Sequence, residues 1–215
     1  MSPPRSEEGF IRAHTAIARP PLVPEIALHL ATEITPIWQA TEDFLELHGI
    51  EPPFWAFAWP GSQALARAVL DGPSLGGWRV LDFAAGCGLA GIAAAMRGAT
   101  VDCAELDPLA LAACRMNAAL NGVSLATPAG DLVGSTNRWD LILAGDVCYE
   151  APMVAHILPW LRRMAAEGAQ VRLADPGRAY VPRAGLEPLA DYAVPTSLEL
   201  EDRAERRVTI ARLLP

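Results

Sequence analysis

Residues 78–91 read WRVLDFAAGCGLAG, and this stretch decides the fold. Residues 78–83 form a short apolar run that predicts a strand, with an acid, Asp82, next to its end. A glycine-rich turn follows, and the alanine-rich residues 89–97 predict a helix that Gly98 ends. A strand, a glycine-rich turn and a helix in this order are typical of an α/β fold that binds its ligand at the turn.

The alternation of strand and helix continues along the chain. Further strands are predicted at 100–104, 124–126, 139–144 and 169–174, and helices at 62–70, 108–120 and 153–166. The last two β segments, 192–200 and 207–213, have no helix between them, which indicates an antiparallel pair. The sequence therefore predicts a doubly wound α/β fold, with a mostly parallel, seven-stranded sheet and an antiparallel edge pair at the C-terminus.

Length and composition fit one α/β domain. The chain has 215 residues, of which 52% are hydrophobic and 20% charged, enough for a sizeable buried core. Residues 1–50 are predicted to form an N-terminal extension packed on the domain, with a helix near 10–18, and residues 51–215 the ligand-binding domain. The net charge of −8 disfavours nucleic acid and anionic membranes as partners.

The cysteines and the apolar runs give two further expectations. No apolar stretch has the length needed to span a bilayer. Four cysteines lie apart from one another, without a Cys-x-x-Cys pair and without histidines at ligand spacing: Cys87, Cys103, Cys114 and Cys148. This pattern predicts reduced thiols in a cytoplasmic protein and no metal site.

The glycine-rich turn admits two ligands. Gly86, Gly88 and Gly91 match the dinucleotide fingerprint G-x-G-x-x-G, and Glu105 follows about twenty residues later, as in an NAD enzyme. In dinucleotide folds, however, the first glycine stands directly at the strand end, whereas here three residues separate Asp82 from Gly86. An acid at this position repels a pyrophosphate and attracts a sulfonium, so S-adenosylmethionine is the predicted cofactor.

Residues 82–88, DFAAGCG, resemble the first motif of the class I methyltransferases, which reads D/E-x-G-x-G-x-G. The resemblance implies a Rossmann-like fold that binds S-adenosylmethionine and releases S-adenosylhomocysteine. The chain departs from the motif at Ala84, which replaces the first glycine. We expect Ala84 to have a negative φ and to leave room for the ligand despite its methyl group. A dehydrogenase and a catalytically silent ligand-binding protein of the same fold are the alternatives.

Two acids at the end of the strand at 100–104 are given different roles. Glu105 is placed where the ribose of the cofactor is expected, and one carboxylate can accept hydrogen bonds from both ribose hydroxyls. Leu106, the next residue, is expected in the cofactor site as well. Asp107 precedes Pro108 and is a good N-cap for the helix that starts there.

Two more residues are candidates for the cofactor site. In the methyltransferase pattern an acid at the position of Asp131 accepts from the adenine amino group, although a simple loop acid is the alternative. Trp59 lies in the Trp-Pro-Gly run before the helix at 62–70. We expect its ring to form a ligand wall near the sulfonium by cation–π attraction, with an ordinary core residue as the alternative.

The methyl acceptor is expected at residues 146–149, which read DVCY and follow the strand at 139–144. They resemble the D-x-x-Y signature of the protein-lysine branch named methyltransferase family 16. Residues 53–61, 145–149 and 175–178 also resemble the electron transfer flavoprotein β-subunit lysine methyltransferases, a likeness that extends over about residues 24–178.

This resemblance implies a protein substrate, the electron transfer flavoprotein β subunit. It implies that Asp146 grips the lysine ammonium and that Tyr149 borders and orients the amine. Another protein lysine or a small amine remains an alternative acceptor. The segment 175–178, DPGR, is interpreted either as a plain turn or as a substrate-facing loop.

Overall fold

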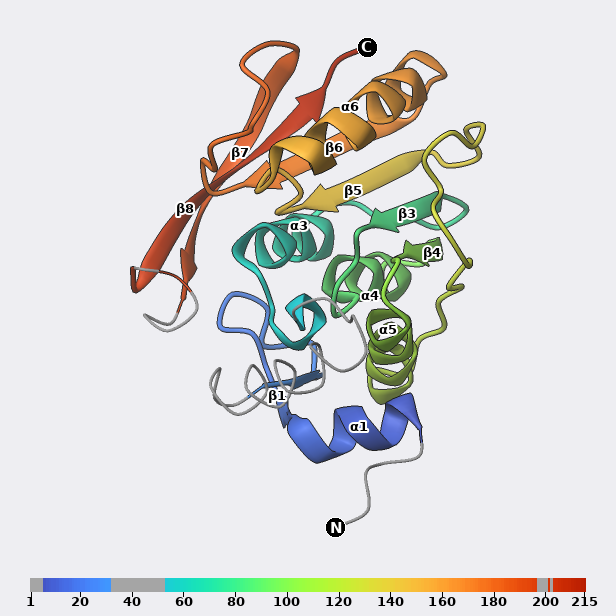
Figure 1. Cartoon of the computed structure of the whole chain (residues 1–215), viewed down its shortest axis with the longest axis vertical. Helices are drawn as coiled ribbons and strands as arrows, with labels where there is room; N and C mark the ends of the chain where they lie inside the picture. The colour runs from blue at the N-terminus through green and yellow to red at the C-terminus, as the bar shows by residue number, and fades with distance from the viewer. Residues whose placement is uncertain (1–5, 32–52, 197–200, 202) are drawn as a thin grey trace.

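The computed structural model describes residues 6–31, 53–196, 201 and 203–215. Its central sheet has six strands in the order β4-β3-β5-β6-β8-β7 (Figure 1). They are β3 (Arg79–Phe83), β4 (Thr100–Ala104), β5 (Leu141–Gly145), β6 (Gln170–Asp175), β7 (Leu186–Pro195) and β8 (Glu205–Leu213). The first four in this order are parallel, and β8 and β7 are antiparallel at the edge. The predicted mostly parallel sheet with an antiparallel C-terminal pair is therefore confirmed.

Two predicted β segments differ in extent. The expected seventh strand at 124–126 is present only as a single parallel bridge between Ala126 and Asp102. Pro128 follows shortly after, and proline cannot donate to a sheet ladder. Strand β7 begins at Leu186, earlier than expected, and contains Pro188 next to a register shift. Proline is tolerated there because β7 is an edge strand.

Helices cover both faces of the sheet. On one face lie α3 (Pro60–Asp71), α4 (Leu89–Met96) and α5 (Pro108–Leu120), and on the other lies α6 (Ala151–Ala166) (Figure 1). Strands β3 and β5 are buried along almost their whole length because they lie between these layers. The two central strands therefore end inside the molecule, and the loops that follow them meet at one edge of the sheet.

The N-terminal segment packs against α5. It contains α1 (Glu7–His14), β1 (Ala16–Ala18) and β2 (Leu28–Leu30), and the short 3-10 helix η1 (Phe54–Ala56) lies beyond residues 32–52 (Figure 1). The predicted helix at 10–18 is wrong in its bounds, because residues 16–18 pair with 28–30 as an antiparallel ladder. Asn117 of α5 and Asn121, the residue that caps its C-terminus, hold this segment: Asn117 Oδ1 accepts from His29 N at 2.8 Å, and Asn121 Oδ1 from Ala27 N at 2.9 Å.

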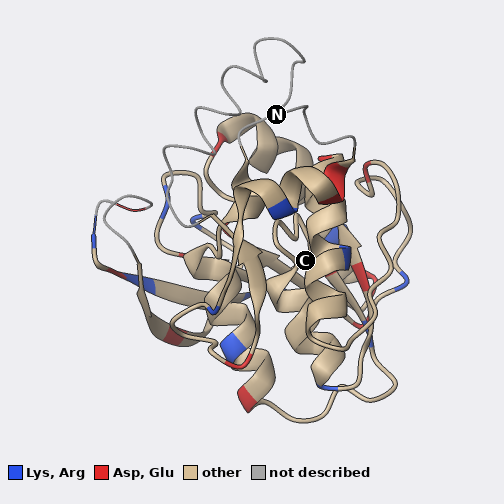
Figure 2. Cartoon of the chain, turned by 90° about the horizontal axis from the view of Figure 1, so that it is seen from below, with Lys and Arg blue, Asp and Glu red and all other residues tan. Residues whose placement is uncertain are grey.

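The division between residues 50 and 51 lies outside the described residues and stays a prediction. Among the described residues, no helix has both the length and the apolar character needed to cross a membrane. Seen from below, positions of basic and acidic residues are interspersed along the described chain (Figure 2).

Candidate active site

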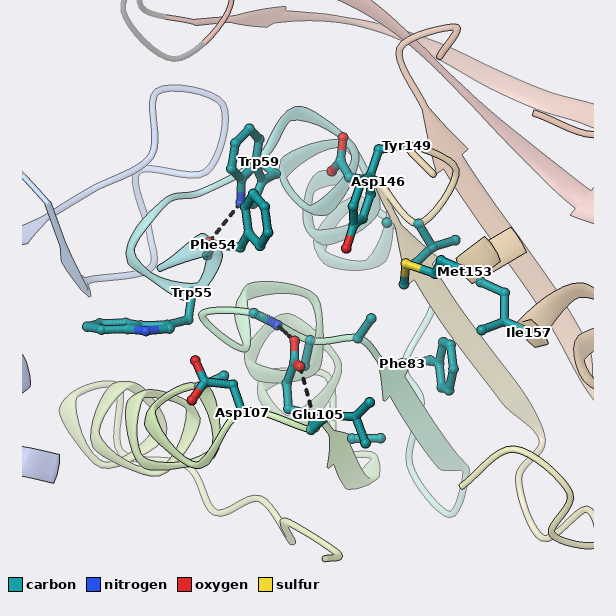
Figure 3. Close-up of a pocket in the computed structure, with 18 of the residues that line it drawn as sticks. Phe54, Trp55, Trp59, Phe83, Glu105, Asp107, Asp146, Tyr149, Met153 and Ile157 are labelled. Carbon is teal, nitrogen blue, oxygen red and sulfur yellow. Dashed lines mark hydrogen bonds between the residues drawn. The ribbon is translucent and has the colours of Figure 1, made fainter. Parts of the chain in front are cut away.

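A cavity of about 920 Å³ opens at the carboxyl ends of β3, β4 and β5. Its walls come from the aromatic segment before α3, the glycine-rich turn after β3, the loops after β4 and β5, and residues 130–133. Glu105 and Asp107 lie on one side, and Trp59, Asp146 and Tyr149 on the other (Figure 3). This edge of a doubly wound sheet is where such folds bind their ligands.

Three residues of the turn between β3 and α4 have backbone conformations in the left-handed region. Gly86 and Gly88 have φ of 54° and 78°, and Ala84 has φ of 53°. The expectation of a negative φ at Ala84 is therefore wrong: the turn requires the left-handed conformation, and alanine adopts it at a cost of about 1–2 kcal/mol. A Cβ on Gly86 would meet only the Trp55 Cα, at 3.9 Å, so the backbone of the turn is open toward the cavity.

Asp82 and Gly88 support this turn from behind and are not among the residues that line the cavity. Asp82 is 3% exposed, and its Oδ2 accepts a hydrogen bond from Gly91 N at 2.7 Å. Sequence reasoning placed this carboxyl beside the ligand, and the structure corrects that placement. Burial raises the pKa of Asp82 to about 8, so it carries little negative charge at neutral pH.

Glu105 joins the end of β4 to the glycine-rich turn. Its Oε1 accepts from Gly86 N at 2.7 Å and its Oε2 from Leu106 N at 3.2 Å, and the carboxylate faces the cavity (Figure 3). Leu106 is exposed and lines the cavity. Asp107 Oδ1 accepts from Leu109 N at 2.8 Å, which confirms the predicted N-cap of α5.

The far end of the cavity holds an acid and a histidine. Asp131 Oδ1 accepts from Val133 N at 2.8 Å, and its Oδ2 lies 2.7 Å from His156 Nε2. Both side chains line the cavity. Sequence reasoning missed His156, because a single histidine on a helix carries no motif.

An aromatic wall closes the opposite side. Trp59 Nε1 donates to the Phe54 carbonyl at 2.7 Å, and the Phe54 ring lies 6.0 Å from that of Trp59 and 5.7 Å from that of Tyr149 (Figure 3). The guanidinium of Arg178 lies 5.9 Å from the centre of the Trp59 ring. The structure thus brings Trp59 to the cavity, where it already faces a cation of the protein itself.

Asp146 is held tightly at the end of β5. Its φ is 58°, its N–H donates to the Ala174 carbonyl at 2.9 Å, and its Oδ2 accepts from Ser62 N at 3.1 Å. Its Oδ1 is buried and accepts no hydrogen bond from any described residue, although Arg178 Nη2 lies 3.7 Å away. Burial raises the pKa of Asp146 to about 7, while the charge of Arg178 opposes that rise.

The segment 175–178 forms the predicted turn, and its last side chain reaches the cavity, while contact with a substrate stays a prediction. Asp175 Oδ1 accepts from Gly177 N at 2.7 Å and from Arg178 N at 2.6 Å, which makes a turn. The Arg178 side chain nevertheless lines the cavity and pairs with the buried Glu201 at 2.8 Å. Glu201 was missed, because an acid within the charged run that starts there gives no sequence signal.

Comparison with known proteins places this fold and site in a class. Residues 63–172 match the family model of Ribosomal protein L11 methyltransferase (PrmA). The Pyrococcus abyssi tRNA (uracil-54, C5)-methyltransferase in complex with S-adenosyl-L-homocysteine has a TM-score of 0.51 and 17% identity, covering 71% of this chain and 38% of that one. TrmN from Thermus thermophilus has a TM-score of 0.50 and 23% identity, covering 71% and 48%. The fold and site are those of a Rossmann-like, S-adenosylmethionine-dependent methyltransferase.

Curated relatives narrow the class. The electron transfer flavoprotein beta subunit lysine methyltransferase of Xenopus laevis is 41% identical over 93% of this chain and 82% of its own length. The protein of the same name from Danio rerio is 38% identical over 84% and 72%. The chain belongs to this family of lysine methyltransferases.

The residues present fit the cofactor of this class. The turn at Gly86 has an open backbone face, and a carboxylate, Glu105, faces the same space for hydroxyl groups. At the opposite wall, Asp146 Oδ1 is a buried acceptor without a donor among the described residues, and its charge favours a cation there.

Proposed function

We propose that this enzyme transfers the methyl group of S-adenosylmethionine to a lysine side chain of the electron transfer flavoprotein β subunit. The observation that carries the proposal is the buried carboxylate of Asp146 in the lining of the cavity, whose Oδ1 has no hydrogen-bond donor among the described residues. A buried acid with an unused acceptor suits an ammonium group. The substrate itself is supported by relatives of that name at up to 41% identity over most of their length.

The cofactor half of the cavity is proposed to use the glycine-rich turn and the end of β4. Glu105 binds the ribose hydroxyls and Asp131 the adenine amino group, as the methyltransferase pattern implies, with Leu106 beside the ribose. Ala84 and Gly86 present their backbone to the ligand, and Trp59 borders its charged end. The cofactor supplies an electrophilic methyl group on a sulfonium.

The acceptor half is proposed to prepare the amine. A free lysine has a pKa of about 10.4, so it arrives as an ammonium, which the Asp146 carboxylate attracts. Apolar side chains that line the cavity, among them Phe54 and Met153, lower the pKa of the amine by desolvation. Because the pKa of Asp146 is raised to about 7, its Oδ1 is also a suitable acceptor for the proton that the ammonium releases. Tyr149 borders this channel and orients the amine.

A second substrate is favoured by one observation. The family model that matches residues 63–172 carries the name of ribosomal protein L11 methyltransferase. The flavoprotein methyltransferases are more similar over a larger share of the chain, which is why we propose the flavoprotein first.

The test is incubation with labelled cofactor and two purified substrates, the electron transfer flavoprotein and ribosomal protein L11. The chain contains no lysine, since all of its 17 basic residues are arginine, so methyl-lysine found by mass spectrometry comes from the substrate. We expect labelled lysines on the flavoprotein β subunit. Label on L11 and none on the flavoprotein contradicts the proposal.

We also propose a cytoplasmic location. All four cysteines are free and buried in the structure, as expected where thiols are kept reduced. Fractionation of cells that express the protein tests this.

A further inference from the structure

A group of charged side chains, most of them buried, surrounds Asp146 at the side of the cavity that we propose for the methyl acceptor. It comprises three acids, Asp146, Asp175 and Glu201, each less than 9% exposed, and two arginines, Arg178 and Arg206. Glu201 lies between the arginines: its Oε1 is 2.8 Å from Arg178 Nη2 and its Oε2 is 2.8 Å from Arg206 Nη2. With all five groups ionised the group has one negative charge in excess, which suits the arrival of one cation.

The Arg178 guanidinium contacts Glu201 and Asp146 differently. It donates a hydrogen bond to Glu201 at 2.8 Å, whereas its Nη2 is 3.7 Å from Asp146 Oδ1, beyond hydrogen-bond distance. Arg178 therefore offers Asp146 its charge without a hydrogen bond, and Oδ1 stays a buried acceptor that has no donor among the described residues. An ammonium that reaches this atom supplies the missing donor.

We propose that Arg178, anchored by Glu201, is a positioning residue that holds the Asp146 carboxylate as an open anion for the target amine. The proposal rests on the proposed function of Asp146 and names the residue on which that function depends.

Arg178 is suited to this task because it opposes the influences that raise the pKa of Asp146. Burial is the largest influence and raises the pKa of Asp146, and the neighbouring Asp175 raises it further. Against this act Arg178 and, more weakly, the amides of Ser62 and Gly61. Without the arginine the carboxyl is expected to be protonated at neutral pH.

The remaining groups near Asp146 do not replace this charge. Cys148 faces it as a neutral thiol, because burial raises the pKa of Cys148 to about 12. Glu201 is an acid and acts on Asp146 only through Arg178, which it holds. Arg206 pairs with the same Glu201 but forms no ion pair with Asp146 among the described residues.

The experiment compares Arg178→Met with Arg206→Met, a matched control. The two arginine side chains are 24% and 23% exposed and bind the same glutamate at the same distance. The pKa of Asp146 is followed by the ¹³C signal of its carboxyl during a pH titration, which needs no substrate. We expect Arg178→Met to raise it by about one to three units, the range for a lost opposite charge, and Arg206→Met to leave it near the wild-type value.

Turnover gives a second readout. At about pH 7, Arg178→Met should raise the KM for the protein substrate at least about fivefold, because a rise of the pKa of Asp146 from about 7 to about 8 lowers its ionised fraction from about one half to about one eleventh. The defect should fade at higher pH, where Asp146 ionises again, and a merely structural loss would persist there. Cofactor affinity by calorimetry should stay within a few-fold of wild type.

If Arg178→Met does not fold, Glu201→Gln tests whether Arg178, held by Glu201, controls the ionisation of Asp146. Released from its anchor, Arg178 is expected to bond Asp146 directly, which lowers the pKa of Asp146 while raising the KM for the protein substrate. An Asp146 titration unchanged in Arg178→Met, or in Glu201→Gln, overturns the inference. A wild-type enzyme inert toward the flavoprotein overturns only the proposed substrate, since the titration stands without it.

Discussion

The two parts of the cavity that we propose for the cofactor and for the methyl acceptor share one backbone feature. Strands β3 and β5 are neighbours, and each is followed by a left-handed residue that is not glycine: Ala84 with φ of 53° and Asp146 with φ of 58°. At Ala84 this feature presents bare backbone to a ligand, and at Asp146 it presents a charge. Such residues cluster at functional sites because the surrounding fold maintains their strain.

The carboxylates of the two halves, Glu105 and Asp146, differ in how many of their oxygens accept hydrogen bonds. Both oxygens of Glu105 accept from backbone amides, so this side chain is fixed as part of the turn. Asp146 has one oxygen bonded to Ser62 N and the other without a donor among the described residues. We therefore propose a rigid, preformed cofactor half and an acceptor half that is completed only by the substrate cation.

The largest expected effect comes from Asp146→Asn. The amide keeps the shape but loses the charge, so methylation should fall by at least about 100-fold, while cofactor affinity stays within a few-fold. Asp140→Asn, which changes an exposed acid just before the amino end of β5, is the control and should remain active. A fully active Asp146→Asn enzyme refutes the division into two halves.

Glu105→Ala should affect the other half. Loss of a charged hydrogen bond predicts about 1.5–3 kcal/mol weaker cofactor binding, measured by calorimetry. Asp107→Ala, two residues further along the chain, removes the N-cap of α5 and should cost about 0.5–2 kcal/mol of folding stability, with a smaller loss of affinity. Equal losses of affinity in the two variants would show that the ribose acid is misassigned.

Asp82→Asn tests the support behind the turn. Because the pKa of Asp82 is raised from its ordinary value to about 8, the folded state binds a proton more tightly than the unfolded state. Its stabilising contribution is complete below about pH 4 and is lost as the pH rises through about 8. Urea unfolding from pH 5 to 8 should show a flatter decline in the variant than in wild type, and parallel declines contradict the raised pKa.

The smallest effect is expected from Ala84→Gly. Relief of left-handed strain of about 1–2 kcal/mol is offset by about 0.4–1 kcal/mol of extra backbone entropy in the unfolded chain. The free energy of unfolding should therefore rise slightly, without loss of cofactor affinity. Ala85→Gly, at a buried neighbour without a positive φ, should only destabilise.

The sequence predicted those elements whose ends carry local signals. Strand β4 and helix α5 have the expected bounds, because an acid followed by Pro108 starts the helix and Asn121-Gly122 closes it. The conformation of Ala84 could not be predicted, since it is imposed by the turn against the residue's own preference. Local intrinsic preference gives way there to tertiary structure.

The candidate site was predictable where a strand end or a short local motif marked it. Asp146 and Glu105 follow strands, and Trp59 and Asp131 lie in short motifs, so the sequence predicted these four residues of the cavity lining. Arg178 reaches Asp146 from the turn after β6, and Glu201 holds Arg178 from the segment before β8. No spacing along the chain encodes that meeting. The burial of Asp82 behind its turn depends likewise on Gly91, which only the folded helix brings to it.

The most direct test of the two-half account is a crystal structure with S-adenosylhomocysteine bound. The account predicts both ribose hydroxyls within hydrogen-bond distance of the Glu105 carboxylate, and the sulfur directed toward Asp146 and Tyr149. It also predicts that Asp146 Oδ1 makes no contact with the product. A ribose away from Glu105, or a product amino group bound to Asp146 Oδ1, would contradict it.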